Sequence, residues 1–321
     1  MTSDAAEADE AAAPLPPQAE AFLIHIAQQR RLSVHTVAAY RRDLAKLARL
    51  LREPEATPDA ADIRRAAARL HGAGQAPASI ARALSAWRSF FRWRAEQGLS
   101  DANPVAGTRA PRRAQRLPKA LAPDTAVRLA AHVADDSPLA LRDHALIELL
   151  YSSGLRLAEL VSLDWRYFEG HGALPRSTSW IDLDAAEVTV LGKGNKTRLV
   201  PVGRAALDAV RAWLAARSAL PARDERALFV SGLGTRIAPR SVQQRIALRA
   251  RQLGLDEHVH PHVLRHSMAS HVLQSSGDLR AVQELLGHAN IATTQIYTRL
   301  DWQHLAKAYD AAHPRARRKA R

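Results

Sequence analysis

The segment from residue 99 to residue 120, which interrupts a long helical pattern, constrains the fold more than any other feature. It reads LSDANPVAGTRAPRRAQRLPKA and contains three prolines. Proline lacks the amide donor that a helix needs, and it disfavours helical geometry in the residue before it. The second half of the segment is basic and contains no acid. We therefore predict a basic linker at 99–120, with one folded domain before it and another after it.

The stretch from residue 18 to residue 98 predicts a compact bundle of four helices. Apolar residues recur there at the helical spacings of three and four, for example at Val37, Tyr40, Leu44 and Leu47. Ser33 is a suitable N-cap, and glycines follow the ends of two of the helices. The expected helices cover 19–31, 34–51, 58–72 and 78–97. Residues 1–17 carry only acids among their charged side chains and end in PLPP, so we predict a disordered acidic tail there.

The outer faces of these four helices are predicted to be rich in arginine. The arginines concerned are Arg30, Arg31, Arg41, Arg42, Arg82, Arg88, Arg92 and Arg94. A single exposed arginine is explained as well by solubility as by contact with a phosphate. As a set on a basic chain, they favour phosphate contact.

The overall charge favours a polyanionic partner. The chain has 46 Lys and Arg against 32 Asp and Glu, a formal net charge of +14. No run of about 18 apolar residues is present, and the acidic start does not resemble a signal peptide. We therefore expect a cytoplasmic protein that binds nucleic acid and no membrane. The absence of cysteine excludes disulfides and thiolate metal sites. The abundance of alanine and leucine predicts a mainly α protein.

The stretch from residue 121 to residue 314 predicts an α+β domain with a small antiparallel sheet. EVTVL and TRLVPV are β-branched runs joined by GKGNK, which is typical of a hairpin. Helices are expected at 140–153, which ends before Gly154, and from Arg156 onward. Further helices are expected at 203–218 and 239–253, with a short strand, ALFVS, between them. The tail 315–321 is predicted to be a basic extension.

The stretch from residue 261 to residue 302 concentrates the chemically useful side chains. His262, Arg265, His288 and Tyr297 lie there, separated by the helix signals of proline, aspartate and glycine. His262 and Arg265 are three residues apart, so both should leave the same face of one helix. A guanidinium supplies permanent charge for a phosphate, imidazoles can exchange protons, and a phenol can attack. This combination indicates chemistry on a phosphodiester.

Each motif by itself has an ordinary structural explanation. GKGNK lacks the G-x-x-x-x-G-K-S/T pattern of a nucleotide-binding loop and is equally well explained as an exposed hairpin. The histidines at 260, 262 and 266 have no H-E-x-x-H pattern beside them, so no metal site is expected. A single arginine such as Arg156 often begins a helix without any further role, and a single tyrosine such as Tyr297 usually lies in a core or an interface.

Taken in order, the motifs resemble those of the tyrosine site-specific recombinases. The chain shows SGLR, then GKGNKTR, then HVLRH, then LLGH, and IYT with its tyrosine nine residues after the histidine of LLGH. The resemblance spans nearly the whole chain and implies an N-terminal SAM-like, four-helix core-binding domain and a C-terminal tyrosine-recombinase catalytic domain. The catalytic positions carried over are Arg156, Lys193, His262, Arg265, His288 and Tyr297.

The resemblance also implies a role for each residue. Tyr297 would be the nucleophile, two arginines would bind the phosphate oxygens, and Lys193 would protonate the leaving 5′ oxygen. Lys196 competes with Lys193 for that role. The stretch from Arg156 to Lys193 is longer than the family usually shows, and residues 166–180 are the expected insertion, in a loop before the hairpin. Many relatives have histidine in place of Arg299, which we do not expect to affect the chemistry.

The resemblance is strongest to the members that resolve chromosome dimers in bacteria. It implies double-stranded DNA with a specific site as the substrate, no cofactor and no metal. The implied partners are a sister recombinase, in a heterotetramer with two of each, and a DNA translocase of the division septum. The last helix, 301–313, would then dock on a neighbouring subunit, with packing on its own domain as the alternative. A plasmid-resolving or mobile-element integrase, or a DNA-binding accessory protein without catalysis, remain the other interpretations.

Overall fold

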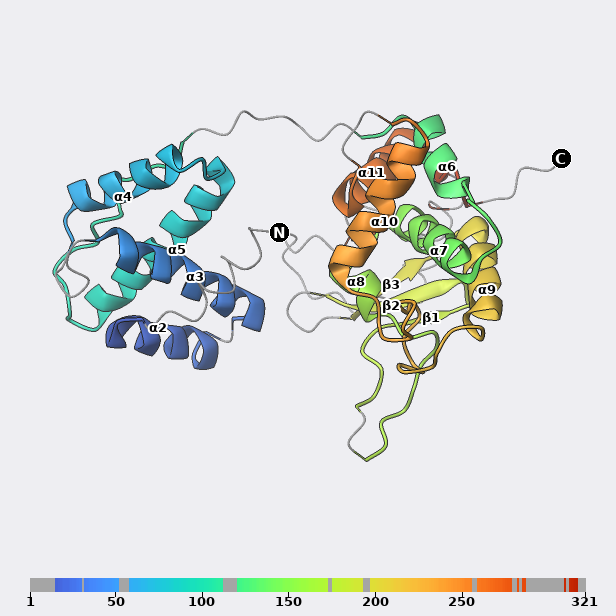
Figure 1. The fold of residues 1–321 in the computed structure, drawn as a ribbon, viewed down its shortest axis with the longest axis horizontal. Coiled ribbons are helices and arrows are strands. Elements are labelled where there is room, and N and C mark those ends of the chain that lie inside the picture. The colour runs from blue at the N-terminus through green and yellow to red at the C-terminus, as the bar shows by residue number, and fades with distance from the viewer. Residues whose placement is uncertain are drawn as a thin grey trace. The chain divides into compact units, whose positions relative to one another are not determined.

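The chain folds into two units that divide between Gln115 and Arg116 (Figure 1). The computed structural model describes residues 15–30, 32–51, 58–111, 120–172, 175–192, 197–255, 259–278, 282, 285–286, 309 and 312–316. The N-terminal unit is helical, and the C-terminal unit combines helices with one small sheet. The predicted fold class, mainly α with an α+β second domain, is thereby confirmed.

The N-terminal unit is the predicted four-helix bundle. Its helices are α2 (Pro17–Gln28), α3 (Val34–Leu50), α4 (Ala60–Gly72) and α5 (Pro77–Glu96). Ser33 caps α3, because its side chain accepts the amide of Thr36 at 3.2 Å. Trp87 of α5 is fully buried, and its indole N–H donates to the carbonyl of Asp43 at 2.7 Å. Burial of aromatic side chains with a satisfied polar edge supplies most of the energy of such a small core.

Both ends of this unit differ from the prediction. Val105 is fully buried in its core, although it lies in the predicted linker 99–120. Asn103 donates to the carbonyl of Arg88 at 2.9 Å, which ties the same segment to α5. Leu15 is also buried, so the predicted disordered tail 1–17 extends too far. In both places an apolar side chain completes the core. Residues 1–14 and 112–119 lie outside the described residues.

Several arginines predicted to face outward have partners within the unit, although Arg82 is itself exposed, as predicted. Arg94 is 7% exposed, so the prediction is wrong for it. Arg82 donates to the buried carboxylate of Asp43 at 2.9 and 3.1 Å. Arg41 binds Glu20 through both nitrogens, and Arg88 donates to backbone carbonyls. A guanidinium engaged in this way fixes helix packing and is a poor candidate for phosphate contact.

The C-terminal unit is built around one buried helix, α7 (Figure 1). Its helices are α6 (Pro123–Ala131), α7 (Pro138–Ser153), α8 (Leu157–Ser162), α9 (Arg204–Arg217), α10 (Pro239–Gln252) and α11 (Pro261–Ser276). Helices α6, α9, α10 and α11 all pack against α7. Leu146, Ile147, Leu149 and Leu150 are all fully buried. The charged residues Arg142, Asp143 and Glu148 of α7 are buried too, each with an ion-pair partner. The prediction from sequence did not include α6.

The sheet has three antiparallel strands in the order β1-β2-β3. They are β1 (Trp180–Asp182), β2 (Glu187–Leu191) and β3 (Thr197–Pro201). Leu191 pairs with Thr197, so the predicted hairpin is confirmed. The described residues of the predicted insertion 166–180 lie in a loop before the hairpin, as expected, except that Trp180 is the first residue of β1. The predicted strand 227–231 is wrong. Only isolated bridges form there, at Ala227 and Val230, because its neighbours are single residues of loops.

The described end of the chain packs on the C-terminal unit itself. Tyr309 is buried, and its hydroxyl lies 2.7 Å from that of Ser152 in α7. Arg315 forms an ion pair with the buried Glu148, and Ala316 is buried too. The predicted boundary of the basic tail at 315 is therefore too early. Packing on its own domain, the alternative to docking on a neighbour, is what these residues show.

A pH-dependent stability is expected from the buried histidine of this segment. His313 donates Nε2–H to the carbonyl of Tyr151 and accepts the amide of Arg315 on Nδ1, so it is neutral. Burial lowers its pKa from 6.5 to about 4. Because the unfolded chain binds this proton more readily, the stabilisation is complete above pH 6.5 and is lost as the pH falls toward 4. The free energy of unfolding should drop by about 2 kcal/mol between pH 7 and pH 5 from this group alone.

The measurement compares the chain with His313→Gln by urea unfolding at the two pH values. Glutamine can keep both hydrogen bonds but does not titrate, so the variant should lose less stability. His271, whose pKa burial also lowers, contributes equally to both proteins. Glu148 has its pKa lowered as well, through His144 and Arg315 against the effect of burial, and therefore titrates below this window. An identical pH dependence of the two proteins would contradict the assignment.

Candidate functional site

Two of the predicted site residues, Arg156 and Arg265, lie close together in the C-terminal unit. Arg156 is the N-cap of α8, directly after the turn that ends α7. Arg265 lies on α11 and is 9% exposed. Burial, followed by the positive charges of Arg156 and Arg198, lowers the pKa of Arg265 to about 10, against the opposing effect of Glu159. The three guanidiniums therefore share one electrostatic environment.

The turn at Gly154 positions both arginines. Gly154 ends α7 with φ 56°, a left-handed conformation that glycine adopts without strain. A Cβ atom at this position would lie 2.3 Å from the terminal methyl of Met268 in α11. Arg265 donates to the carbonyl of Gly154 and to that of Leu286. The turn at Gly154 thus leads directly to Arg156 in the sequence, and its carbonyl holds Arg265.

A buried carboxylate, Glu159, connects two of the guanidiniums. It accepts two hydrogen bonds from Arg198, at 2.7 and 2.8 Å. It also accepts the amide of Arg156 at 2.8 Å and a guanidinium N–H of Arg156 at 2.8 Å. Burial would raise the pKa of Glu159, but the hydrogen bonds and charges of Arg198 and Arg156 lower it below its usual value. Glu159 is therefore ionised at neutral pH and fixes the direction of Arg156.

The sequence prediction did not single out Glu159 or Arg198. The signal for Glu159 was present, because an acid three residues after the N-cap commonly accepts the N-cap amide. The signal for Arg198 was the period of two in TRLVP, which places it on the inward face with Val200. An arginine at an inward position of a strand requires a buried partner.

The cluster has an excess of positive charge. Three guanidiniums, of Arg156, Arg198 and Arg265, and one carboxylate, of Glu159, leave a net charge of +2. An anion with several oxygens would offset this excess and bind the planar N–H forks. The arrangement suits one phosphate of a phosphodiester.

The other predicted site residues are less well placed by the structure. His262 is exposed in the first turn of α11, and its ring centre lies 6.1 Å from that of His260. Lys193, His288 and Tyr297 lie outside the described residues. The structure thus brings together Arg156 and Arg265, shows His262 on the helix of Arg265, and leaves the other three as predictions.

A substitution of Glu159 is expected to reduce stability. Glu159→Gln keeps the shape of the side chain but leaves Arg198, which is 7% exposed, without a counter-charge. Removing one partner of a buried ion pair costs about 3 kcal/mol or more. The free energy of unfolding of the full chain, measured in urea, should fall by that amount.

The matched control is Asp208→Asn in the same unit. Asp208 forms an exposed ion pair with Arg211 at 3.7 Å, three residues along α9. Exposed pairs of this kind contribute roughly 0–1 kcal/mol. Equal effects of the two substitutions would show that the carboxylate of Glu159 is not the anchor of the cluster.

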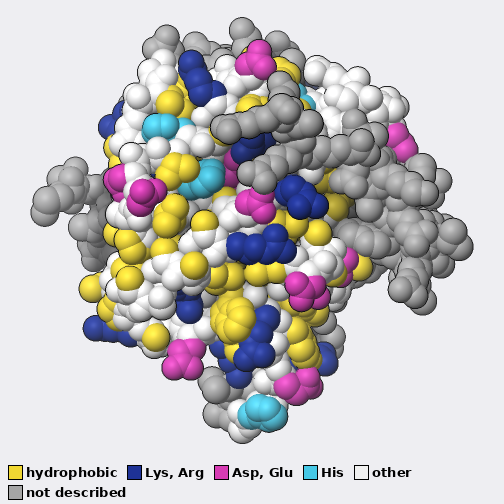
Figure 2. All heavy atoms as spheres, turned by 90° about the vertical axis from the view of Figure 1, so that its right-hand side faces the viewer, with side chains coloured by type: hydrophobic (Ala, Val, Ile, Leu, Met, Phe, Trp, Pro, Cys, Tyr) yellow, Lys and Arg dark blue, Asp and Glu magenta, His cyan; other side chains and the backbone are white. Residues whose placement is uncertain are grey.

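Other kinds of site find no support within the described residues. No group of three or more His, Asp or Glu side chains in that part of the chain is arranged to hold a metal ion. None of the helices that the structure describes combines the length and the apolar character needed to cross a membrane. On the face shown in Figure 2, Lys and Arg side chains are interspersed with Asp and Glu, so this face is not a uniformly basic surface.

Comparison with known families matches both units. The model of the phage integrase family matches residues 119–304. The model of the N-terminal SAM-like domain of phage integrases matches residues 19–98. Together these matches cover most of the chain.

Named relatives match over nearly their whole length. Tyrosine recombinase XerC 1 of Ralstonia nicotianae is 53% identical over 97% of this chain and 97% of its own. Tyrosine recombinase XerC of Alcanivorax borkumensis is 52% identical over 93% of this chain and 94% of its own.

Solved structures share the fold at lower identity. A lambda integrase dimer bound to a COC′ core site gives a TM-score of 0.63 at 18% identity, covering 87% of this chain and 98% of that one. The XerH site-specific recombinase in a post-cleavage complex with a palindromic difH substrate gives 0.63 at 20% identity, covering 90% and 84%.

Proposed function

This chain belongs to the phage integrase family of tyrosine recombinases, and from that membership we propose that it cuts and rejoins DNA at a specific site through a 3′-phosphotyrosyl intermediate. The observation that carries the proposal is the cluster of Arg156, Glu159, Arg198 and Arg265, whose excess positive charge suits a phosphodiester. The relatives named as tyrosine recombinases are 53% and 52% identical in sequence to this chain over nearly its whole length.

In the proposed cleavage step, the phenol oxygen of Tyr297 attacks the scissile phosphorus. A bond forms between that oxygen and phosphorus, and the bond from phosphorus to the 5′ oxygen breaks. The transition state carries more negative charge on the non-bridging oxygens than the substrate does. Hydrogen bonds to Glu159 and to the carbonyl of Gly154 hold Arg156 and Arg265, which supports a role in stabilising this charge with little reorganisation.

Two protons must move in the same step. A free phenol has a pKa near ~10 and is a weak nucleophile until its proton is accepted. We assign that acceptor role to His262, and we assign to His288 a hydrogen bond to a phosphate oxygen. Lys193 gives its proton to the leaving 5′ oxygen, which would otherwise depart as a strongly basic alkoxide.

The energy of the broken bond is kept in the phosphotyrosyl ester. A 5′ hydroxyl from another strand can attack that ester and release Tyr297, so rejoining needs no nucleotide cofactor. Side chains supply the charges and protons, and the proposed step therefore uses no metal ion.

The proposed cellular role is resolution of chromosome dimers in the cytoplasm at cell division. Similarity to relatives named XerC over nearly the whole chain supports this role. The ending QHLAKAYDAAHPRA favours the XerC part over that of its sister, XerD. The partners would be a XerD-type recombinase, two of each in a heterotetramer on paired duplexes, and a DNA translocase of the division septum.

The test uses DNA that carries a chromosomal dimer-resolution site with a nick beside the scissile phosphate. After cleavage, the short fragment diffuses away and the protein stays covalently bound to the DNA. We expect a covalent complex that persists in a metal chelator, with the phosphate on Tyr297 when the peptide is mapped. Mapping the cut strand, with and without the sister recombinase, tests the XerC role. A protein that shifts this DNA without forming a covalent bond would be a binding protein only, and trapping only on plasmid or transposon ends would indicate another integrase.

A further inference from the structure

We propose that Ser179, directly before β1, is a positioning residue for Lys193. Residues 165–179, which precede β1 and overlap the predicted insertion 166–180, are called the arm below. The inference rests on the proposed function, in which Lys193 protonates the leaving 5′ oxygen. It assigns to the arm a part in the reaction, namely fixing the end of β2 from which the lysine turn begins.

The pairing of β2 with β1 ends before this turn, whereas its pairing with β3 continues to Leu191 and Thr197. Pairing between β1 and β2 stops at Trp180 and Thr189, yet β2 continues to Leu191. The amide of Leu191 donates to the hydroxyl oxygen of Ser179 at 3.1 Å. Ser179 is 2% exposed, so water cannot easily replace it. A side chain thus takes the place of the backbone acceptor that β1 no longer offers, two residues before Lys193.

Ser179 itself is held by the backbone of Asp164. The carbonyl of Ser179 accepts the amide of Asp164 at 2.9 Å, and the carbonyl of Asp164 accepts the amide of Ile181 at 3.1 Å. Residues on both sides of Trp180 are therefore fixed to the residue that follows the end of α8. The hydroxyl of Ser179 has a defined position because its backbone does.

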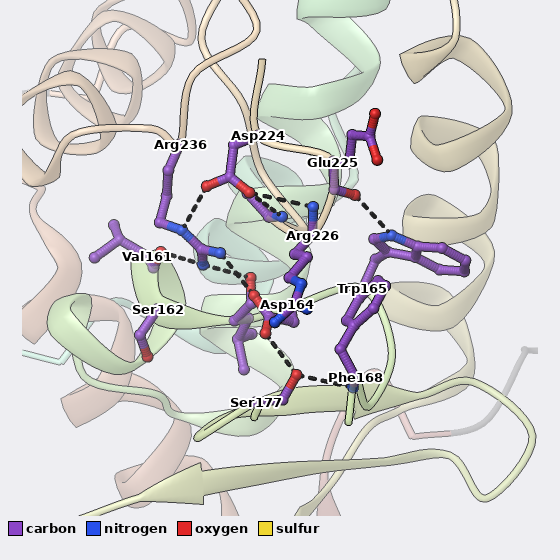
Figure 3. Close-up of polar contacts among 12 residues, drawn as sticks. Val161, Ser162, Asp164, Trp165, Phe168, Ser177, Asp224, Glu225, Arg226 and Arg236 are labelled. Carbon is purple, nitrogen blue, oxygen red and sulfur yellow. Dashed lines mark hydrogen bonds and ion pairs between the residues drawn. The ribbon is translucent and has the colours of Figure 1, made fainter. Parts of the chain in front are cut away.

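The carboxylate of Asp164 is the centre of this attachment (Figure 3). It accepts from Arg236 at 2.6 Å and from the hydroxyl of Ser177 at 2.6 Å. Arg236 also donates to Asp224 at 3.1 Å and to the carbonyl of Leu163 at 3.0 Å, beside the end of α8. The base of the arm, the end of α8 and the loop of Asp224 are therefore joined by short, partly buried hydrogen bonds.

This attachment links two parts of the proposed active site. Helix α8 begins after Arg156 and ends at Ser162. The hydrogen bonds of Asp164 and Arg236 hold the end of α8, and the bond from Leu191 to Ser179 extends this set to the end of β2. These hydrogen bonds thus connect α8, which follows the proposed phosphate ligand Arg156, to the end of β2 that precedes Lys193 in the chain. A catalytic group on a turn needs such support, because a displacement of about 1 Å can cost a large factor in rate.

The outer part of the arm is separate from this role. Phe168 and Ser177 join the two sides of the arm and are called its neck. The amide of Phe168 donates to the hydroxyl of Ser177, and the amide of Ser177 donates to the carbonyl of Phe168, both at 2.9 Å. Arg226 contacts the outer part of the arm, because its guanidinium donates to the carbonyl of Pro175 at 2.7 Å. The hydrogen bond to Leu191 of β2 comes from Ser179, which lies between the neck and β1. We therefore assign the positioning role to Ser179 and not to the outer part of the arm.

The test separates loss of proton donation from general damage by changing the leaving atom. In one nicked DNA the 5′ bridging atom at the scissile phosphate is oxygen, and in the other it is sulfur. When the bond from phosphorus to sulfur breaks, the sulfur leaves with the electron pair as a thiolate, which is weakly basic and needs no proton. Single-turnover formation of the covalent complex is measured for the full chain on both DNAs.

We expect Ser179→Ala to slow cleavage of the oxygen DNA about tenfold and to restore the rate on the sulfur DNA. Lys193→Ala is the reference and should show the same pattern with a larger factor, about a hundredfold. Ser267→Ala is the matched control, since Ser267 is also a buried serine whose hydroxyl accepts an amide, that of Leu121 at 2.9 Å. Any slowing by Ser267→Ala should be equal on both DNAs.

The possible outcomes distinguish a failure of the role proposed for Ser179 from a failure of the proposed recombinase function. If Ser179→Ala matches the unchanged chain on the oxygen DNA, or is equally slow on both DNAs, Ser179 does not position the lysine turn. If Lys193→Ala is not restored by sulfur, the proposed role of Lys193 fails instead. If no protein forms a covalent complex with either DNA, the recombinase function itself is overturned.

Discussion

Replacing Tyr297 with phenylalanine should abolish covalent attachment to nicked DNA, with a loss on the order of 10⁴-fold or more. The substitution removes only the oxygen that is proposed to attack phosphorus. Affinity for the same DNA, measured by a gel shift, should change little, because binding depends on the phosphate contacts of the arginines. The ratio of cleavage to binding is therefore the quantity to report.

Tyr309→Phe is the matched control for that experiment. Tyr309 lies in the same C-terminal region, is buried, and bonds to the hydroxyl of Ser152 at 2.7 Å. Losing its oxygen should cost about 1 kcal/mol of stability and leave covalent attachment intact. A covalent complex formed by Tyr297→Phe, or lost in Tyr309→Phe while the protein stays folded, would contradict the choice of nucleophile.

Arg265→Lys should lower the rate of cleavage about 10³-fold, although the formal charge is conserved. The guanidinium of Arg265 donates to two carbonyls, of Gly154 and Leu286, while its fork presents further N–H groups. An amine is a point charge on a flexible stem and cannot reproduce this geometry. Burial and the charges of Arg156 and Arg198 would also lower the pKa of the introduced amine, as they do that of Arg265.

The pH dependence of this variant adds a second measurement. Because the pKa of an amine in this place lies below its usual value, the amine loses its proton as the pH rises. The residual cleavage of Arg265→Lys should therefore fall between pH 7 and pH 9. Arg265 itself, with a pKa of about 10, stays mostly protonated over that range.

Arg211→Lys is the control for the loss of a guanidinium. Arg211 is an exposed residue of α9 that donates to the carbonyl of Leu183 at 3.0 Å. Its substitution should change cleavage less than about twofold, since surface contacts of this kind contribute little. Cleavage by Arg265→Lys within tenfold of the unchanged chain would remove Arg265 from the phosphate site.

Local sequence signals were sufficient for most of the helices and for the hairpin. Ser33 marks the start of α3 and Gly154 the end of α7, because a cap or a left-handed residue acts within one turn of its own position. The β-branched runs EVTVL and TRLVPV, joined by GKGNK, were likewise sufficient to predict that β2 and β3 form a hairpin. The short elements α6 and β1 escaped prediction, since a few residues carry too weak a periodic signal.

The order of the motifs along the chain was also sufficient to recognise the family. Arg156, His262 and Arg265 were selected for their chemistry and for their place in that order. The structure adds that Arg156 and Arg265 meet, although 108 residues separate them in the numbering. For Lys193, His288 and Tyr297 the assignments stay predictions.

The sequence by itself determined most of the helices and turns, and it selected the candidate residues for a phosphodiester reaction. Only the tertiary structure decided which charged groups are buried and with whom. It pairs Glu159 with Arg198 across 39 positions and buries Arg94, where the sequence pattern placed an exposed arginine. The physical reason is range: helix and turn signals act between neighbours along the chain, whereas burial of a charge depends on elements that approach from far away.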